Sequence, residues 1–101
     1  MKIFLDDYRA LPKSAKGFEW VKTYRACKTL IDVFGNSIDF IDLDYDLGTE
    51  ETGYDILVYM KEKGIRPAHI NIHSDHPEGA PEMRKYAERE FLDSTITQNK
   101  V

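Results

Sequence analysis

The sequence has little cysteine, a shortage of basic residues and no low-complexity tract or internal repeat, and these absences exclude several classes of protein. Its single cysteine, Cys27, cannot form a disulfide within the chain, so no disulfide framework holds the fold. Lysine and arginine number 14 against 18 aspartate and glutamate residues, which gives a net charge of −4. General nucleic-acid binding needs basic patches that neutralise phosphates, and we therefore do not expect it here.

Long apolar runs are absent as well. The run at residues 3–5 (Ile-Phe-Leu) is far too short for a signal peptide or a membrane-spanning helix, so we expect a cytoplasmic protein with no membrane partner. The length of 101 residues suits one domain rather than two, and the 42% of hydrophobic residues is enough for a core. We predict a single domain over residues 1–101, in which residues 93–101 form a flexible polar tail.

Short apolar segments alternate with segments of helical periodicity. Strands are expected at residues 3–5, 18–23, 38–43 and 68–72, and helices at residues 24–34, 54–63 and 80–91. Thr23 is a candidate N-cap of the first helix, and Gly35 and Gly64 stop the first two helices. This alternation is typical of a mostly parallel sheet covered by helices. We therefore predict an α/β protein with a flavodoxin- or receiver-like three-layer fold and a mostly parallel four-stranded sheet.

Acidic or polar residues follow three of the expected strands. They are Asp6 and Asp7 after the first strand, Asp44 and Asp46 after the strand at 38–43, and His73 and Ser74 after the strand at 68–72. The carboxyl ends of parallel strands lie along one edge of a sheet, where the ligands of such folds bind. We therefore expect these three clusters, which are far apart in the sequence, to converge on one site.

Seven acidic residues lie between positions 39 and 55, with no basic residue among them. Carboxylates this close repel one another and raise one another's pKa unless a cation lies between them. Mg²⁺ or Mn²⁺ suits the task, because such ions take carboxylate oxygens and complete their shells with water and phosphate oxygens. Glu50 and Glu51 are better explained as parts of a solvated acidic loop. The candidate metal ligands are Asp6, Asp7, Asp44 and Asp46.

The alternating aspartates of residues 42–46 suggest two other kinds of site, and the sequence argues against both. An EF-hand loop counted from Asp42 needs glycine at its sixth position and glutamate at its twelfth, where Leu47 and Gly53 stand. A phosphatase of the haloacid-dehalogenase type carries its Asp-x-Asp motif after the first strand of a much longer chain. A nucleophile elbow and a glycine-rich phosphate loop are both absent.

Four residues at this edge are candidates for catalysis. Asp44 is one, as a metal ligand or as a covalent phosphoryl acceptor. His73 can exchange a proton near neutral pH, unless it is a structural histidine at a strand end. Ser74 can donate a hydrogen bond to a phosphoryl oxygen or cap the following helix. The planar guanidinium of Arg9 suits a phosphate oxygen or a salt bridge to a nearby aspartate.

The order of these residues resembles that of the receiver domains of response regulators. A receiver has an acidic pair after its first strand, a phospho-accepting aspartate after the third, a serine or threonine after the fourth and a lysine after the fifth. Asp6-Asp7, Asp44 and Ser74 match in order. After the last helix only about ten polar residues remain, so the fifth strand and its helix are expected to be missing, with no lysine at the matching place. The loop after the first strand is too short for a full first helix.

A second resemblance is closer and covers nearly the whole chain. The residues that carry it are 3–12 (IFLDDYRALP), Trp20-Val21, 44–48 (DYDLG), 53–55 (GYD), 72–74 (IHS), Pro77, Gly79 and Met83. Together they resemble the cyclic-phosphate-processing receiver-like domain, a truncated relative of receivers. The resemblance implies the handling of cyclic phosphates in RNA-repair or nucleotide settings. The chain departs from that pattern at Tyr45, where the family has histidine, and at His76 and Glu82, where it has asparagine.

Three functions remain open from the sequence. The first is a metal-dependent phosphoesterase that acts on a cyclic phosphate or nucleotide, in which the metal polarises the phosphoryl group and His73 or His76 moves the proton. The second is a non-enzymatic, degenerate receiver domain that binds a metal, a nucleotide or a partner protein. The third is an accessory protein that blocks another protein through its acidic face. The expected ligand is small and carries a phosphate or cyclic phosphate, and no partner protein can be named.

Overall fold

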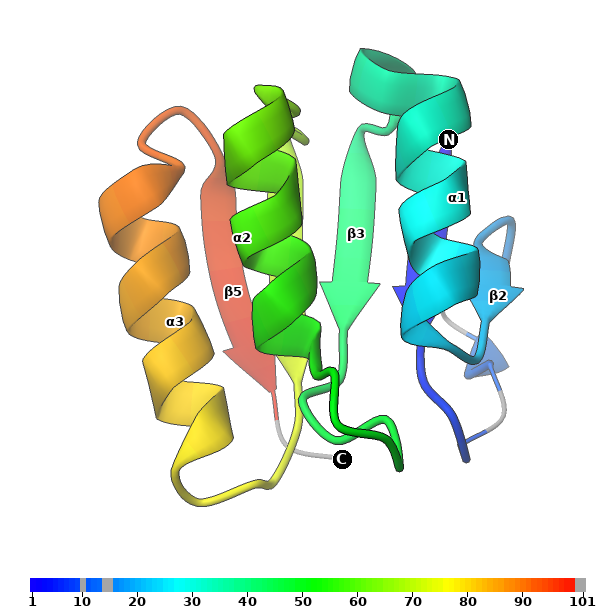
Figure 1. The fold of residues 1–101 in the computed structure, drawn as a ribbon, viewed down its shortest axis with the longest axis vertical. Helices are drawn as coiled ribbons and strands as arrows, with labels where there is room; N and C mark the ends of the chain where they lie inside the picture. The colour runs from blue at the N-terminus through cyan, green and yellow to red at the C-terminus, as the bar shows by residue number, and fades with distance from the viewer. Residues whose placement is uncertain (10, 14–15, 100–101) are drawn as a thin grey trace.

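The computed structural model describes residues 1–9, 11–13 and 16–99 of the chain. In chain order its elements are β1 (Lys2–Leu5), β2 (Glu19–Val21), α1 (Tyr24–Phe34), the short 3₁₀ helix η2 (Gly35–Ser37), β3 (Phe40–Leu43), α2 (Gly53–Lys63), β4 (His69–His73), α3 (Gly79–Glu90) and β5 (Thr95–Asn99). The five strands form one parallel sheet in the order β2-β1-β3-β4-β5 (Figure 1). The predicted parallel α/β class and receiver-like fold are confirmed. None of the described helices combines the length and the apolar character that a membrane crossing requires.

The prediction of four strands is wrong, because Thr95–Asn99 forms a fifth strand, β5. It pairs in parallel with all five residues of β4. Its sequence, Thr-Ile-Thr-Gln-Asn, does not indicate a strand by its pattern, because an edge strand needs few apolar residues and this one has only Ile96. Residues 95–99 of the expected flexible tail are therefore part of the sheet.

The end of β5 also changes the comparison with a receiver domain. This strand ends at Asn99, so the next residue in the sequence is Lys100. The expectation that no lysine follows a fifth strand does not hold, because it depended on the absence of that strand. Lys100 and Val101 themselves lie outside the described residues.

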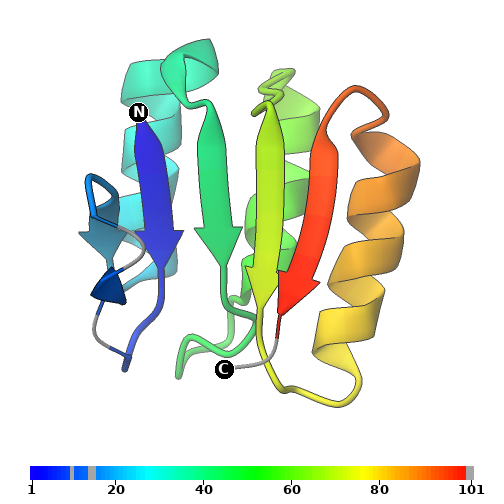
Figure 2. The same ribbon diagram turned by 180° about the vertical axis from the view of Figure 1, so that it is seen from behind.

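All three α-helices lie on the same face of the sheet, so the fold has two layers (Figures 1 and 2). Figure 2 looks onto the other face, where the strands stand in front of the helices. The expected three-layer arrangement is absent from the described residues, because the segment between β1 and β2 forms no α-helix in its described part. The described part of this segment agrees with the predicted lack of a full first helix, and the helices of the described residues leave one face of the parallel sheet without a covering layer.

The hydrophobic core lies between the sheet and the helices. Every second residue of β1, β3 and β4 points into this core and is completely buried: Ile3, Leu5, Ile41, Leu43, Ile70 and Ile72. The helices contribute apolar side chains that include Ile31, Ile56, Leu57, Met60, Met83 and Ala87. Cys27 is buried there too, and burial raises the pKa of its thiol to about 12, so it packs as a small apolar residue.

The uncovered face of the sheet carries polar side chains joined in a hydrogen-bonded chain. The hydroxyl of Thr97 donates to Asn71 Oδ1 at 2.6 Å. The side-chain amide of Asn71 donates in turn to Asp42 Oδ1 at 2.9 Å and to Asn99 Oδ1 at 2.6 Å. Half-buried and exposed polar groups on this face are thus paired with one another. Two stacked ring pairs lie on the same face, Phe4 with His73 and Phe40 with His69.

Candidate functional site

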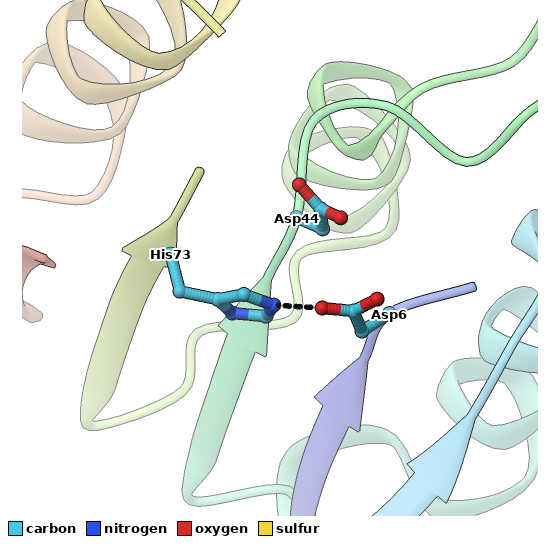
Figure 3. A group of neighbouring side chains, drawn as sticks. All are labelled: Asp6, Asp44 and His73. Atoms are coloured by element: carbon cyan, nitrogen blue, oxygen red, sulfur yellow. Dashed lines mark hydrogen bonds and ion pairs between the residues drawn. The ribbon is translucent and has the colours of Figure 1, made fainter. Parts of the chain in front are cut away.

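Three neighbouring strands end at one edge of the sheet and bring Asp6, Asp44 and His73 together (Figure 3). Asp6 follows β1, Asp44 follows β3, and His73 is the last residue of β4. One nitrogen or oxygen atom of each side chain lies within 4.8 Å of those of the other two. The three residues are 0%, 6% and 1% exposed, so two carboxylates and an imidazole share a buried site. Clusters that are far apart in the sequence do converge.

Asp6 is held in place by the loop that follows β1. Its Oδ1 accepts the backbone N–H groups of Tyr8 at 2.9 Å and Arg9 at 2.8 Å. Its backbone oxygen accepts the indole N–H of Trp20 at 2.9 Å. The guanidinium of Arg9 also lies 3.8 Å from Oδ2. The Tyr8 and Arg9 amides fix the carboxylate in one orientation at a place that water does not reach, and Trp20 holds the backbone of Asp6.

His73 lies between two carboxylates. Its Nδ1 is 2.5 Å from Asp42 Oδ1, and its Nε2 is 3.0 Å from Asp6 Oδ2. Burial alone disfavours a charged ring, but the hydrogen bonds to Asp42 and Asp6 and the charge of Asp44 outweigh it and raise the pKa of His73 above its ordinary value. In the absence of a metal ion, the ring therefore keeps its second proton more readily than a free histidine and donates to both carboxylates.

Asp42 belongs to this site, although the spacing of the motifs does not select it. It lies within β3, two residues before Asp44. Since side chains alternate along a strand, this spacing directs Asp42 and Asp44 to the same side of the sheet, which is the signal that could have identified Asp42. Its contact with His73 could not be identified in the same way, because it depends on the register of β3 and β4.

Replacing Asp42 with Asn should lower the pKa of His73, because the ring loses one of its two carboxylate partners. The measurement is an NMR titration of the His73 ring protons in the wild-type protein and in Asp42→Asn. His76, whose Nδ1 accepts the Gly79 amide instead, is the internal reference. An identical His73 titration in both proteins would show that the contact with Asp42 has no electrostatic effect.

The surroundings of Asp44 disfavour its ionised form. Burial and the charge of Asp6 raise its pKa to about 6, against the opposing effects of His73 and of the Tyr45 amide. Its Oδ1 accepts that amide N–H at 2.8 Å, and no donor among the described residues reaches Oδ2. Because no fully buried side-chain oxygen among the described residues lacks a hydrogen bond, this Oδ2 is open to the solvent of the pocket that Asp44 lines. At neutral pH an ionised Asp44 therefore lies beside a second carboxylate with one oxygen free for water or a bound cation.

A pocket of about 580 Å³ opens beside the buried group. Asp7 and Asp46 are exposed there, and Asp46 Oδ1 accepts the Gly48 amide at 2.9 Å, so neither joins the buried group of three. Ser74 is buried, and its Oγ accepts the amide of His76 at 3.2 Å instead of capping α3. The pocket thus gathers the remaining predicted site residues around Asp44. Its lining includes Asp7, Arg9, Asp44, Asp46, Ser74 and His76.

A family model described as the cyclic-phosphate processing receiver domain matches residues 1–89 of the chain. No curated protein and no solved structure matches it. The matched segment runs from β1 into the last turn of α3 and therefore contains Asp6, Asp44 and His73. The strand β5 lies beyond the match.

Proposed function

Since the chain belongs to the family of cyclic-phosphate processing receiver domains, we propose that it is a metal-dependent phosphoesterase that acts on a cyclic phosphate or a nucleotide. The observation that carries this proposal is the buried group of Asp6, Asp44 and His73 beside a pocket whose volume suits a small ligand. A cyclic phosphate diester carries one negative charge, which a metal ion and a nearby arginine would balance.

The residues at the strand ends fit a divalent metal ion such as Mg²⁺ or Mn²⁺. Asp6 and Asp44 supply two buried carboxylates, and the exposed Asp7 and Asp46 line the pocket beside them. The unpaired Oδ2 of Asp44, which receives no hydrogen bond from the described residues, favours a cation at this place. A metal ion bound there would polarise a phosphoryl oxygen and lower the pKa of a bound water.

Arg9 and Ser74 supply donors for the phosphoryl oxygens. The Arg9 side chain is 41% exposed, so its guanidinium can turn toward a phosphate in the pocket that it lines. Ser74 uses its oxygen to accept the His76 amide and keeps its hydroxyl hydrogen for a ligand. Both donors would stabilise the negative charge that develops on the phosphoryl oxygens as the ring of the substrate opens.

The hydrogen bond to the leaving oxygen is better assigned to His76 than to His73. Both ring nitrogens of His73 are engaged by carboxylates, those of Asp42 and Asp6. Nδ1 of His76 accepts the Gly79 amide at 2.8 Å, so the neutral ring carries its hydrogen on Nε2 and can donate it to a ligand in the pocket. His73 then acts on the carboxylates rather than on the substrate.

The alternative is a receiver domain that binds its ligand or accepts a phosphoryl group without hydrolysing a substrate. Two features favour it: the complete five-stranded parallel sheet, and the lysine that follows β5 in the sequence. In that case Asp44 would be phosphorylated by a small phosphodonor such as acetyl phosphate, and cyclic nucleotides would not be consumed.

The two functions are separated by incubating the protein and Mn²⁺ with a panel of 2′,3′-cyclic and 3′,5′-cyclic nucleotides and following the products by ³¹P NMR. At least one nucleotide should be hydrolysed, and Asp44→Asn should slow turnover at least about a hundredfold. Asp93→Asn is the matched control and should keep wild-type turnover, because Asp93 is 87% exposed and precedes the amino end of β5, whereas the site lies at the carboxyl ends of the parallel strands. No turnover with any nucleotide, together with acetyl phosphate labelling of Asp44, would contradict the phosphoesterase.

A further inference from the structure

We propose that His73 is itself a metal ligand, so that Asp6, Asp44 and His73 form a centre of two carboxylates and one imidazole that prefers a divalent transition-metal ion to Mg²⁺. The inference rests on the proposed function for the presence of a metal ion at this edge of the sheet. It goes further in assigning a nitrogen ligand and, through that ligand, the class of metal.

The spacing of His73 and Asp6 suits two neighbouring ligands of one ion. His73 Nε2 and Asp6 Oδ2 are 3.0 Å apart, and Figure 3 shows this nitrogen directed at the carboxylate, with Asp44 beside the pair. Two ligand atoms that each lie about 2.1 Å from an ion and bind at right angles are about 3.0 Å apart. The two side chains therefore stand at the separation that shared coordination needs.

Asp42 prepares the ring of His73 for this role. The contact of 2.5 Å between Asp42 Oδ1 and Nδ1 places a hydrogen on Nδ1, so that Nε2 is the nitrogen left to face Asp6. Asp42 is itself held by the side-chain amide of Asn71 at 2.9 Å. A carboxylate that accepts the outer N–H of a metal-bound histidine fixes the tautomer and makes the coordinating nitrogen more basic.

A hydrogen atom or a cation must lie between Nε2 and the Asp6 oxygen, because two lone pairs 3.0 Å apart repel each other. A ring N–H fits this spacing, and a metal ion would fit it as well. No arginine or lysine of the described chain takes this place, since the nearest, Arg9, has its Nη1 3.8 Å from Asp6 Oδ2. A carboxylate oxygen of Asp44 then completes the set of three ligands.

The imidazole decides which metal fits best. Mg²⁺ takes oxygen ligands and keeps much of its water, whereas imidazole nitrogen binds transition metals with an affinity that rises from Mn²⁺ to Co²⁺. A site of three buried protein ligands, one of them nitrogen, therefore discriminates against Mg²⁺. A site made only of aspartates has no imidazole ligand and would lack this reason to prefer a transition metal to Mg²⁺.

Isothermal titration calorimetry with MgCl₂, MnCl₂ and CoCl₂ tests this preference. The wild-type protein should bind in the order Mg²⁺ < Mn²⁺ < Co²⁺, with at least about tenfold between Mg²⁺ and Co²⁺. His73→Gln should lose that preference, and Asp42→Asn should weaken Co²⁺ binding by about ten- to a hundredfold. Thermal melts of each variant establish that it is folded before its titration is interpreted.

Pulsed electron paramagnetic resonance of bound Mn²⁺ gives a direct readout that needs no activity and, for the wild-type protein, no variant. A ¹⁴N coupling from a directly bound imidazole should be present in the wild-type protein. It should persist in His76→Gln, the matched control, because His76 lines the neighbouring pocket but bonds to the Gly79 amide. It should disappear in His73→Gln.

The outcomes separate this inference from the proposed function. Bound Mn²⁺ without a ¹⁴N coupling, or a folded His73→Gln that keeps the wild-type preference for Co²⁺, overturns the inference and leaves a carboxylate metal site and its hydrolysis standing. A coupling that depends on His73, in a protein that hydrolyses none of the cyclic nucleotides, supports the inference and contradicts only the proposed function. No binding of any of the three metals overturns the inference outright.

Discussion

Replacing Asp44 with Asn should raise the melting temperature of the metal-free protein at pH 7 and abolish its stabilisation by Mn²⁺. The ionised carboxylate is buried beside Asp6, which raises the pKa of Asp44 from 3.8 to about 6. A shift of about two units corresponds to about 2–3 kcal/mol of unfavourable free energy at neutral pH. Asparagine keeps the shape without the charge, so the melting temperature should rise on the order of 10 °C.

The pH dependence of this gain follows from the direction of the shift. A carboxyl whose pKa is higher in the folded than in the unfolded chain contributes its full stability below the unfolded value, and this contribution is lost as the pH rises through the folded value. The destabilising effect of wild-type Asp44 therefore grows as the pH rises from about 4 to about 6 and is complete above that range. The free energies of unfolding of the two proteins should converge near pH 4 and differ most above pH 6, as measured by urea denaturation.

The stabilisation of the protein by Mn²⁺ should be lost in Asp44→Asn, although the variant without metal is more stable than the wild type. A ligand that binds only the folded wild-type protein adds about 2.7 kcal/mol to its stability when present at a hundred times its dissociation constant. Asp44→Asn lacks one carboxylate and should gain little or nothing from Mn²⁺, whereas the exposed Asp93→Asn should respond like the wild type. A metal-free Asp44→Asn protein that is less stable than the wild type at pH 7 would show that Asp44 is not a strained carboxylate.

Gly53→Ala should destabilise the fold by about 3 kcal/mol, the upper range of the cost of overpacking. A Cβ atom at Gly53 would lie 1.9 Å from the backbone oxygen of Asp44 and 3.0 Å from Met83 Cε. The backbone oxygen of Asp44 cannot rotate away from the added Cβ, as the end of a flexible side chain could. The start of α2 must therefore move away from the end of β3, which breaks the bond of 2.9 Å from the Gly53 amide to the Tyr45 oxygen.

The effect of Gly53→Ala should extend to the site, because the displaced backbone is that of Asp44 itself. Chemical denaturation measures the stability, and calorimetry with Mn²⁺ measures the affinity, which should fall as well. Gly64→Ala is the matched control: it has open space around its Cβ and only the cost of its φ of 73°, about 1–2 kcal/mol. If the two variants lose the same stability, close packing at Gly53 is not the reason for its glycine.

The helices are the part of the fold that the sequence predicts best. The expected helix at residues 24–34 is α1, and the Thr23 hydroxyl accepts the Ala26 amide at 3.0 Å as a helix N-cap does. The Thr52 and Asp55 side chains form a capping box at the start of α2, and Gly64 ends it in a left-handed conformation. Caps and stops act within one turn, so the local sequence determines them.

Contacts between strands could not be predicted in the same way. Asp42 meets His73 only because β3 and β4 pair in one register, and no local pattern encodes a register. The sequence also did not predict that one face of the sheet, the uncovered face, lacks helices. The apolar run at residues 3–5 is typical of a strand covered on both sides, but Phe4 is buried by stacking on His73 rather than by a helix.

The two faces of the sheet differ in how freely their residues can be exchanged over time. On the helix side the constraint is volume, and a core isoleucine can be replaced by a similar apolar residue one position at a time. On the open side the constraint is complementarity of donors and acceptors, since Asn71 alone serves Thr97, Asp42 and Asn99. A change at Asn71 removes hydrogen bonds from several partners at once and reaches His73 through Asp42. Core residues can therefore be substituted one at a time, whereas the hydrogen-bonded residues of the uncovered face are expected to change together.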